Sequence, residues 1–323
     1  MLKPTPRAKF GEATPPAIFP PIFGLLGLGL AWRAAVDVFD VPPGVAQFIL
    51  GAVTLLFLFS LVAYTRKVIR RPGVVAEDLR VLPGLAGLAA MVLAVYLLAA
   101  ALLPLSTAAA RVALFAGAAL HLGLFTLVLH GLATGPAAQR QVTPVWHLTF
   151  AGIIFAPVAA VPLGYQAASL VILYAAGGIA VPIWAASLVQ LARRDPPPPL
   201  RPLLAIHLAP ASLLGSVALI LGHERLATGC AWFAGLILAA LLIRARYVTV
   251  TGFNPLWGAF TFPLAAFATL MLHLAAAGQG EGYRVVGAVA LVAGTLIIPA
   301  IAVKVMKGWA KGDLAAKTNA ARA

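Results

Sequence analysis

The sequence predicts an all-α integral membrane protein with ten transmembrane helices. Of its 323 residues, 62% are hydrophobic and only 10% are charged, whereas a soluble domain carries about a quarter charged residues. The apolar residues gather in ten runs, each close to the roughly 20 residues with which a helix crosses about 30 Å of hydrocarbon. These observations exclude an ordinary soluble enzyme, a disordered chain and a nucleic-acid-binding module.

The runs are separated by prolines, glycines and charged residues, which mark helix ends. The first five are 16–36 before Asp37, 45–65 between Gly44 and Arg66, 80–103 before Pro104, 111–132 from Arg111, and 144–164 from Pro144 to Gly164. The last five are 168–191 before Arg193, 202–222 from Pro202 to Gly222, 226–243 between Arg225 and Arg244, 254–274 before Gly278, and 284–304 from Arg284 to Lys304. Because the links are short, we expect a tail (1–15), one transmembrane domain (16–304) and a second tail (305–323).

The basic residues predict the orientation in the membrane. Lys and Arg number 23 against 9 Asp and Glu, which gives a net charge of +14. With ten spans, all but four of the basic residues fall on the side that carries both tails; the exceptions are Arg33, Arg111, Arg225 and Arg284. Because cytoplasmic loops are rich in Lys and Arg, we expect a multi-pass protein of the cell (inner) membrane with cytoplasmic N- and C-termini.

Prolines distinguish the odd-numbered runs from the even-numbered ones. The odd runs contain Pro20, Pro21, Pro83, Pro157, Pro162, Pro210 and Pro263, whereas only Pro182 and the late Pro299 interrupt even runs. Proline removes a backbone donor, which is tolerated at membrane depth only where protein or a water-filled cavity satisfies the freed groups. We therefore expect the odd helices to line a pore, with Pro157, Pro210 and Pro263 among the lining residues. The alternative is that prolines are simply common in membrane helices.

The sequence offers little that predicts catalysis. All 9 acidic residues lie in tails, loops or span ends, whereas intramembrane acids mark pumps and cation-coupled transporters. The single cysteine excludes a multi-cysteine metal site, and no HExxH, CxxC, GxSxG or Walker pattern is present. We expect no enzyme, no cofactor and no metal. His147 and His207 lie early in odd runs and are candidates for a cytoplasmic vestibule, although a lone histidine in a helix is more often packed.

The ninth run brings aromatic residues close to the middle of the membrane. Phe262 lies about eight residues into it, or about 12 Å deep at 1.5 Å per residue. An aromatic ring beside a proline there has the shape of a plug, although a buried phenylalanine is more often part of a core. Phe260 and, in the first run, Phe23 are further candidates for lining a pore.

Three motifs, in this order, suggest a family. They are Phe23-Gly24 followed by LGLGLAWR ending at Arg33, IHLAPA beginning at Ile206, and FNP beginning at Phe253 followed by AFTF ending at Phe262. With these motifs the chain resembles the TehA-like tellurite-resistance/dicarboxylate transporter (TDT) family, which is related to the slow-type anion channels of plants. The resemblance extends from the first run to the ninth.

The resemblance implies more about fold and site than the residues alone. It implies five hairpins in a quasi-fivefold arrangement, with the odd helices lining a central pore and the even helices facing lipid. It implies a homotrimer in which each protomer has its own pore. It also implies that Phe262 is the gate and that its ring packs near Gly24.

We interpret the protein as an anion channel or facilitator that passes small inorganic or organic anions through an uncharged, proline-kinked pore. An uncharged pore favours throughput over tight binding, and basic residues such as Arg80 and Arg201 would raise the anion concentration at the inner mouth. One alternative is a secondary carrier, proton-coupled or not, for C4-dicarboxylates, tellurite or sulfite. A third interpretation is a sealed structural or sensory membrane protein.

Overall fold

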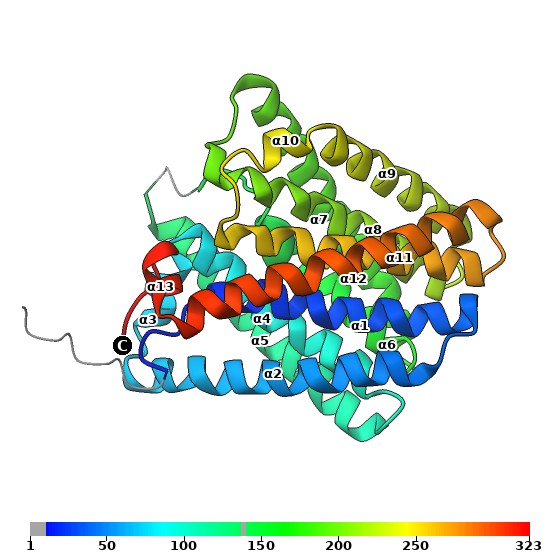
Figure 1. Ribbon diagram of the computed structural model, residues 1–323, viewed down its shortest axis with the longest axis horizontal. Helices are drawn as coiled ribbons and strands as arrows, with labels where there is room; N and C mark the ends of the chain where they lie inside the picture. Colours follow the sequence, from blue (N-terminus) through cyan, green and yellow to red (C-terminus); the bar gives the residue numbers. More distant parts are fainter. Residues whose placement is uncertain (1–10, 137–139) are drawn as a thin grey trace, which may run out of the picture.

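The computed structural model describes residues 11–136 and 140–323, and every regular element within these ranges is a helix. Nine helices of this part of the chain are long and apolar enough to cross a membrane. They are Pro16–Phe39, Pro43–Arg70, Leu82–Leu102, Thr107–Thr134, Gln166–Arg193, Pro198–Ile220, Glu224–Ile243, Pro255–Ala276 and Glu281–Ala310. Figure 1 shows them bundled, with most of the long helices following the long axis of the molecule.

The fifth predicted span differs from the expectation of one helix over 144–164. It consists of the π-helical η3 (His147–Ala151), the 3-10 helix η4 (Gly152–Phe155) and α6 (Ala156–Ala160). α6 ends at Ala160, and a turn from Val161 to the positive-φ Gly164 follows it. The segment His147–Ala160 is apolar but shorter than the nine long helices, so a tenth span here stays a prediction.

Burial separates the helices into two classes. We call inner segments η1–α1 (Pro16–Ile18 and Phe19–Phe39), α4 (Leu82–Leu102), η3–η4–α6, η5–α8 (Pro198–His207 and Leu208–Ile220) and η6–α11 (Pro255–Phe260 and Thr261–Ala276). The outer helices are α2 (Pro43–Arg70), α5 (Thr107–Thr134), α7 (Gln166–Arg193), α9 (Glu224–Ile243) and α12 (Glu281–Ala310). In the four inner spans 56% to 83% of the apolar window is buried, against 17% to 39% in the outer helices.

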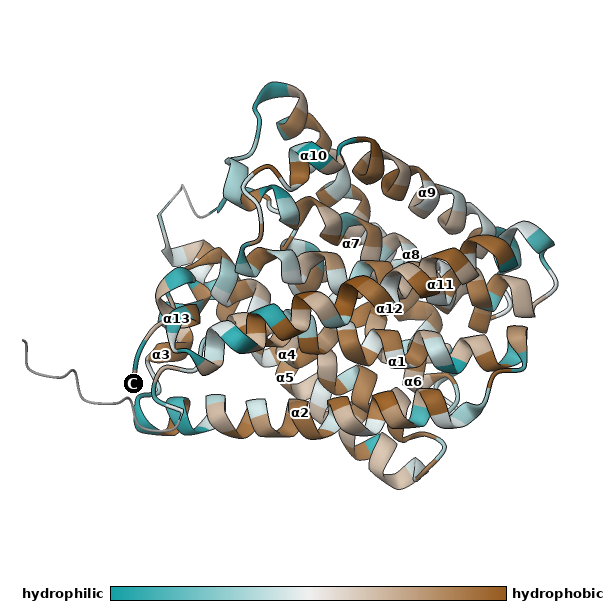
Figure 2. Ribbon diagram, in the orientation of Figure 1, coloured by the Kyte–Doolittle hydropathy of each residue, from teal (hydrophilic) through white to brown (hydrophobic). Residues whose placement is uncertain are grey.

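The outer helices expose large apolar side chains, among them Phe48, Leu55, Trp232, Leu236 and Leu296. In water such a surface would drive aggregation, whereas hydrocarbon accepts it without cost. Figure 2 shows hydrophobic residues over the whole length of the outer helices, with hydrophilic residues near the two ends of the bundle. The protein is therefore a multi-pass membrane protein.

Each outer helix packs against the inner segment that precedes it, which makes five sequential hairpins. The pairs are α1 with α2, α4 with α5, α6 and η3 with α7, α8 with α9, and α11 with α12. The inner segments also contact one another: α1 packs on α4, α4 on η3 and α6, η4 on α8, α8 on α11, and α11 on α1. The short links between helices force antiparallel neighbours within a hairpin.

The inner prolines occupy the first turns of α-helical stretches rather than helix centres. Pro20, Pro83 and Pro157 are the second residues of α1, α4 and α6, and Pro210 and Pro263 are the third residues of α8 and α11. A proline in the first turn removes an N–H whose acceptor would lie before the α-helix, so the hydrogen bonds within the α-helix that follows stay intact. The irregularity of the inner segments instead comes from 3-10 or π lead-ins, which four of the five possess.

A buried ion pair holds the two described chain ends together at one end of the bundle. Lys67 Nζ lies 2.8 Å from Asp78 Oδ2, and both side chains are fully buried. Asp78 also accepts hydrogen bonds from the Tyr64 hydroxyl at 3.0 Å and from the Ala321 N–H at 2.9 Å. Lys67 donates to the Thr14 carbonyl at 3.1 Å. The C-terminal segment, including α13 (Asp313–Lys317), is thus anchored next to the start of α1.

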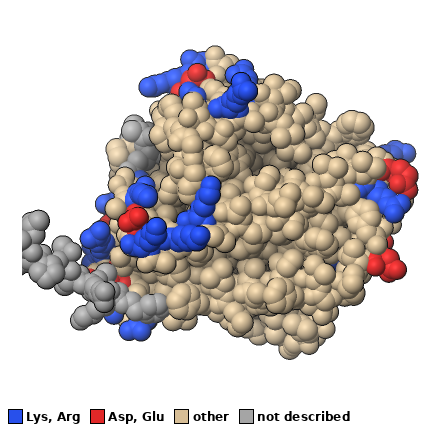
Figure 3. Space-filling model, in the orientation of Figure 1, with Lys and Arg blue, Asp and Glu red and all other residues tan. Residues whose placement is uncertain are grey.

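Charged side chains gather at the ends of the bundle. Figure 3 shows Lys and Arg at the end that carries the C-terminus and over α10 (Ala245–Val248), and a mixture of acidic and basic residues at the opposite end. Between the ends the visible face is almost free of charge. This distribution fits helices whose middle parts lie in hydrocarbon.

Candidate functional site

A small cavity lies among the first turns of the inner segments. Its volume is about 30 Å³. All five inner segments contribute to the lining, which consists of Ala17, Pro20, Phe23, Pro83, Ala86, Ala90, Leu148, Leu203, Ile206, Ala209, Pro255, Leu256, Gly258, Ala259, Phe262 and Pro263. Every lining residue is apolar, a proline or a glycine.

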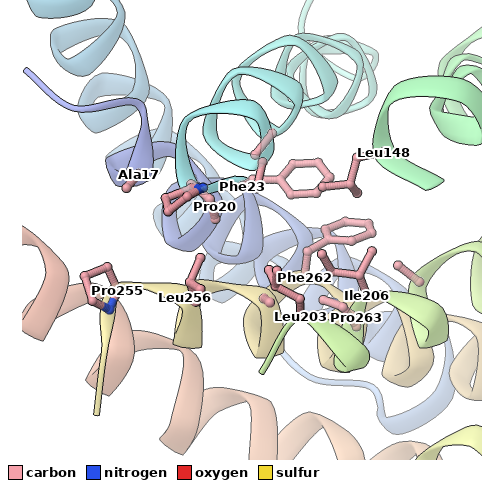
Figure 4. A pocket seen from close by; sticks show the side chains of 16 residues that line it. Ala17, Pro20, Phe23, Leu148, Leu203, Ile206, Pro255, Leu256, Phe262 and Pro263 are labelled. Atoms are coloured by element: carbon pink, nitrogen blue, oxygen red, sulfur yellow. The ribbon is translucent and has the colours of Figure 1, made fainter. Parts of the chain in front are cut away.

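Two aromatic rings in this lining stack on each other. The rings of Phe23 and Phe262 have centroids 4.1 Å apart and an interplanar angle of 20°. Figure 4 shows these rings side by side at the cavity, with Leu148 and Ile206 close by. Phe23 and Phe262 are almost fully buried, so the space between them is closed to water.

A third ring completes the aromatic cluster. Phe155, the last residue of η4, lies 4.9 Å from Phe262 and 5.2 Å from Phe23, measured between ring centroids. We call Phe23, Phe155 and Phe262 the phenylalanine cluster. Its members come from the first, third and fifth inner segments, so the cluster ties three parts of the bundle together. Phe155 was not predicted from the sequence. The signal was a nearby proline: Pro157 follows Phe155 by two residues, and Pro263 directly follows Phe262.

Two glycines of α1 leave room for the ninth predicted span. A Cβ atom on Gly27 would lie 2.8 Å from Cδ2 of the Phe262 ring, which is too close for a real contact. Gly24 lies instead against the side chain of Thr261 and the backbone N–H of Phe262. The Thr261 hydroxyl donates to the Pro20 carbonyl at 3.1 Å, which draws the start of α11 onto α1. Gly27 therefore leaves room for the Phe262 ring, and Gly24 leaves room for the Thr261 side chain and the Phe262 backbone.

The remaining pore-lining candidates differ in their position relative to the cavity. Pro263 lines it, whereas Pro157 and Pro210 are buried in the first turns of α6 and α8 and are not part of the lining. Phe260 contacts Trp257, with ring centroids 5.6 Å apart. Phe260 is therefore separated from Phe262 although only one residue lies between them.

His147 and His207 meet in the structure, although 60 residues separate them. His147 Nε2 lies 3.0 Å from His207 Nδ1, and both side chains are buried. The adjacent residues Leu148 and Ile206 line the cavity, whereas the two histidines do not. Trp184 of α7 packs on His147 and donates to the His207 carbonyl at 3.2 Å. The pair joins η3 to η5 and does not face an open vestibule.

Arg80 and Arg201 lie outside the cavity lining. Arg80 is exposed at the end of α3 (Val74–Leu79), three residues before the cavity-lining Pro83. Arg201 stacks on Tyr247, with the guanidinium carbon 3.9 Å from the ring centroid, and donates to the Pro196 carbonyl. Burial, together with a hydrogen bond to Asp195, raises the pKa of Tyr247. The ring therefore stays neutral beside Arg201.

Among the residues that the structure describes, the lining of the cavity contains no ionisable side chain. Among the described residues there is no group of three or more His, Cys, Asp or Glu side chains that could hold a metal ion. Cys230 is a free thiol on α9, away from the cavity. The arrangement can therefore act on a solute through shape, exclusion of water and backbone dipoles, not through ionised ligands.

A comparison with protein families finds one match. The family model described as SLAC1, voltage-dependent anion channel, matches residues 13–306, which include all nine spans except the last few residues of α12. No curated protein matches the chain.

Proposed function

The chain belongs to the SLAC1 family of voltage-dependent anion channels, and on this premise we propose that it is a channel or facilitator that passes small anions through the centre of the inner segments. The observation that carries the proposal is the cavity lined by all five inner segments and closed by the phenylalanine cluster. Family membership supports anion transport. The cavity residues support the further proposal that the anions pass between the inner segments.

The pathway has five helical hairpins around a quasi-fivefold axis, with the inner segments next to it. The chain of contacts from α1 through α4, α6, α8 and α11 back to α1 supports this closed order. The contrast in burial between inner and outer helices supports an outer layer that faces lipid. The third inner segment is shorter than the others, but it also contacts both of its neighbours in this closed order, α4 and α8.

Phe262 is the gate of this pathway in our proposal, and Phe23 and Phe155 are its neighbours in the closed state. The three rings pack on one another at the cavity, so a hydrated anion does not pass without movement of a ring. Rotation of Phe262 away from Phe23 requires no charged group to move. Gly27 fixes the position of the ring because no side chain separates it from α1.

An apolar lining suits transport of anions that bind weakly. A fixed charge in the pathway would trap a counter-ion, whereas selection by radius and dehydration cost allows rapid release. The basic end of the bundle, with Arg80 and Arg201 near the cavity, raises the local anion concentration. We place this end in the cytoplasm of a cell (inner) membrane, with both termini on that side, and we expect a homotrimer with one pathway in each protomer.

The test is anion flux through the purified protein in liposomes, measured for wild type and Phe262→Ala. We expect the variant to carry a larger chloride current because the cluster loses a ring that lines the cavity and stacks on Phe23. Phe267→Ala is the matched control: Phe267 is buried on the same helix but does not line the cavity. An equal current in wild type and Phe262→Ala contradicts the gate.

The same liposomes discriminate the other functions. Reversal potentials with chloride, nitrate, sulfite, tellurite and malate establish which anions pass. A flux that rises linearly with the gradient and does not change internal pH supports a channel, whereas saturation with a coupled pH change indicates a proton-coupled carrier. Absence of flux in both wild type and Phe262→Ala indicates a sealed membrane protein.

A further inference from the structure

A groove lies on the lipid-facing side of α1, away from the cavity. Leu25 of α1, Leu56 of α2 and a stretch of α12 from Pro299 to Ala310 line it, and its volume is about 380 Å³. This volume is within the range of about 300–1,000 Å³ that is usual for small-molecule sites. The groove exists because α2 and α12 both pack along α1 but make few contacts with each other. Figure 1 shows α2 and α12 on either side of α1.

The end of the groove near the C-terminus has aromatic and basic residues. Phe59 of α2 contacts Trp309 of α12, with ring centroids 5.8 Å apart, and so brings the two helices together there. Lys307 is the charged residue of the lining. Lys304 and Lys311 lie three residues before it and four after it, on the same face of the helix. Figure 3 shows basic side chains at this part of α12.

The three lysines have no carboxylate to neutralise them. All three are exposed, and none forms an ion pair with an acidic residue of the described chain. Lys304 Nζ lies 5.0 Å from the ring centroid of Phe253, a cation–π contact that leaves the charge of the ammonium group without a counter-ion. A long apolar trough that ends at three unneutralised ammonium groups is complementary to a molecule with a long apolar chain and an anionic head.

We propose that the groove binds one anionic phospholipid. Its acyl chain lies along Leu25, Leu56 and Val303, and its phosphate is held by Lys307 together with Lys304 and Lys311. The apolar part of the groove lies at the depth of the acyl chains, and the three lysines lie at the depth of the phosphate. This is so because lysines at the end of a membrane helix extend to the headgroup layer, while the helix itself borders hydrocarbon. A zwitterionic lipid fills the apolar part equally well but does not neutralise the three ammonium groups.

The bound lipid would contact the helix that carries one member of the phenylalanine cluster. Leu25 follows Phe23 by two residues, which places the two side chains about 200° apart around α1. The acyl chain therefore packs on the outer face of α1 while Phe23 packs on Phe262 at the inner face. A lipid bound in the groove therefore influences the position of α1 through the outer face of that helix.

The role of the three lysines is tested by native mass spectrometry of the full chain in detergent, titrated with phosphatidylglycerol or phosphatidylcholine. We expect wild type to retain one phosphatidylglycerol in preference to phosphatidylcholine. Because each lysine near an anionic surface contributes about a fivefold factor, the triple variant Lys304→Gln, Lys307→Gln, Lys311→Gln should lose at least about tenfold of this preference. The matched control replaces Arg193, Arg194 and Arg246, which are equally exposed but lie on α7 and α10. An equal loss in both triple variants overturns the proposal, because it indicates general attraction to a basic surface.

The groove itself is tested by filling it. Val303→Trp places a large side chain in the groove, whereas Val289→Trp places one on an exposed position of the same helix outside it. We expect only Val303→Trp to release the tightly held phosphatidylglycerol. Unchanged lipid retention in Val303→Trp overturns the proposal, and so does a change of oligomeric state in Val303→Trp alone, because a second copy of the chain would then be the occupant.

Discussion

Replacing Asp78 by Asn should destabilise the protein more than any other single loss of charge. The carboxylate is fully buried and receives Lys67, the Tyr64 hydroxyl and the Ala321 N–H. The amide oxygen of asparagine can replace Oδ2 as the acceptor for Tyr64 and Lys67, but it carries no charge, and the amide NH2 then faces the Ala321 N–H in place of an acceptor. The variant therefore creates an uncompensated buried cation.

The expected magnitude follows from the burial of both partners. Removal of one member of a buried ion pair costs about 3–5 kcal/mol, whereas an exposed pair contributes little. For a chain of this size we expect the apparent melting temperature to fall by at least about 5 °C. The control is Glu77→Gln, which breaks the exposed Arg71–Glu77 pair at 2.7 Å. The Arg71 hydrogen bond lowers the pKa of Glu77, so the group is ionised and its loss changes the same net charge at neutral pH.

The assay is thermal unfolding of the detergent-purified protein, followed by tryptophan fluorescence and by size-exclusion chromatography after heating. Hydrogen exchange should increase at the N–H of Ala321 and around Thr14, since both are held by the network. The double variant Lys67→Met, Asp78→Asn removes the unpaired cation and should recover part of the loss. Equal melting temperatures for Asp78→Asn and Glu77→Gln, or a double variant as unstable as Asp78→Asn, would refute the reasoning.

Three further predictions concern the site. Phe155→Ala should raise chloride current in liposomes less than Phe262→Ala does, because Phe155 supports the other two rings without lining the cavity; a larger increase than in Phe262→Ala would reverse their roles. Gly27→Ala should displace the Phe262 ring, whose Cδ2 would lie 2.8 Å from the new Cβ, and change the current, whereas Gly51→Ala, with nothing within 4 Å, should not. His147→Gln should lower the free energy of unfolding by about 1 kcal/mol through the loss of the contact with His207 and leave the reversal potential unchanged; a shifted reversal potential would place the pair in the pathway.

The long spans could be predicted from the sequence because each depends on local composition. The outer helices have an uninterrupted apolar surface that lipid accepts, so their limits follow from charges and turns. The third inner segment could not be predicted in this way. Its form depends on close packing, for example that of Gly152, where a Cβ would lie 2.9 Å from Leu93 Cδ2. Such a contact with a residue 59 positions away has no signature in a hydropathy profile.

The site was predicted in part, for the same physical reason. Proline and aromatic residues in the odd runs, together with the resemblance, directed attention to Phe23, Phe262 and Pro263, which line the cavity. Phe155 and Gly27 were missed because their importance arises only when three helices meet. The contact between His147 and His207 was missed because each is a single histidine in its own segment, and only the packing of η3 on α7 and of η5 beside it joins them.

In the proposed pathway an apolar cavity can still favour anions over cations, because the α-helical parts of four inner segments begin beside it. α1, α4, α8 and α11 contribute Pro20, Pro83, Ala209 and Phe262 to the lining, each within the first turn of its helix. The start of an α-helix carries a partial positive charge of about half an elementary charge, and this charge acts strongly where water is excluded. The prolines in these first turns remove N–H groups that could bind an anion tightly, but they leave the dipoles of the following peptide groups aligned. In the pathway proposed above, such a combination of positive potential and few donors would attract an anion without retaining it.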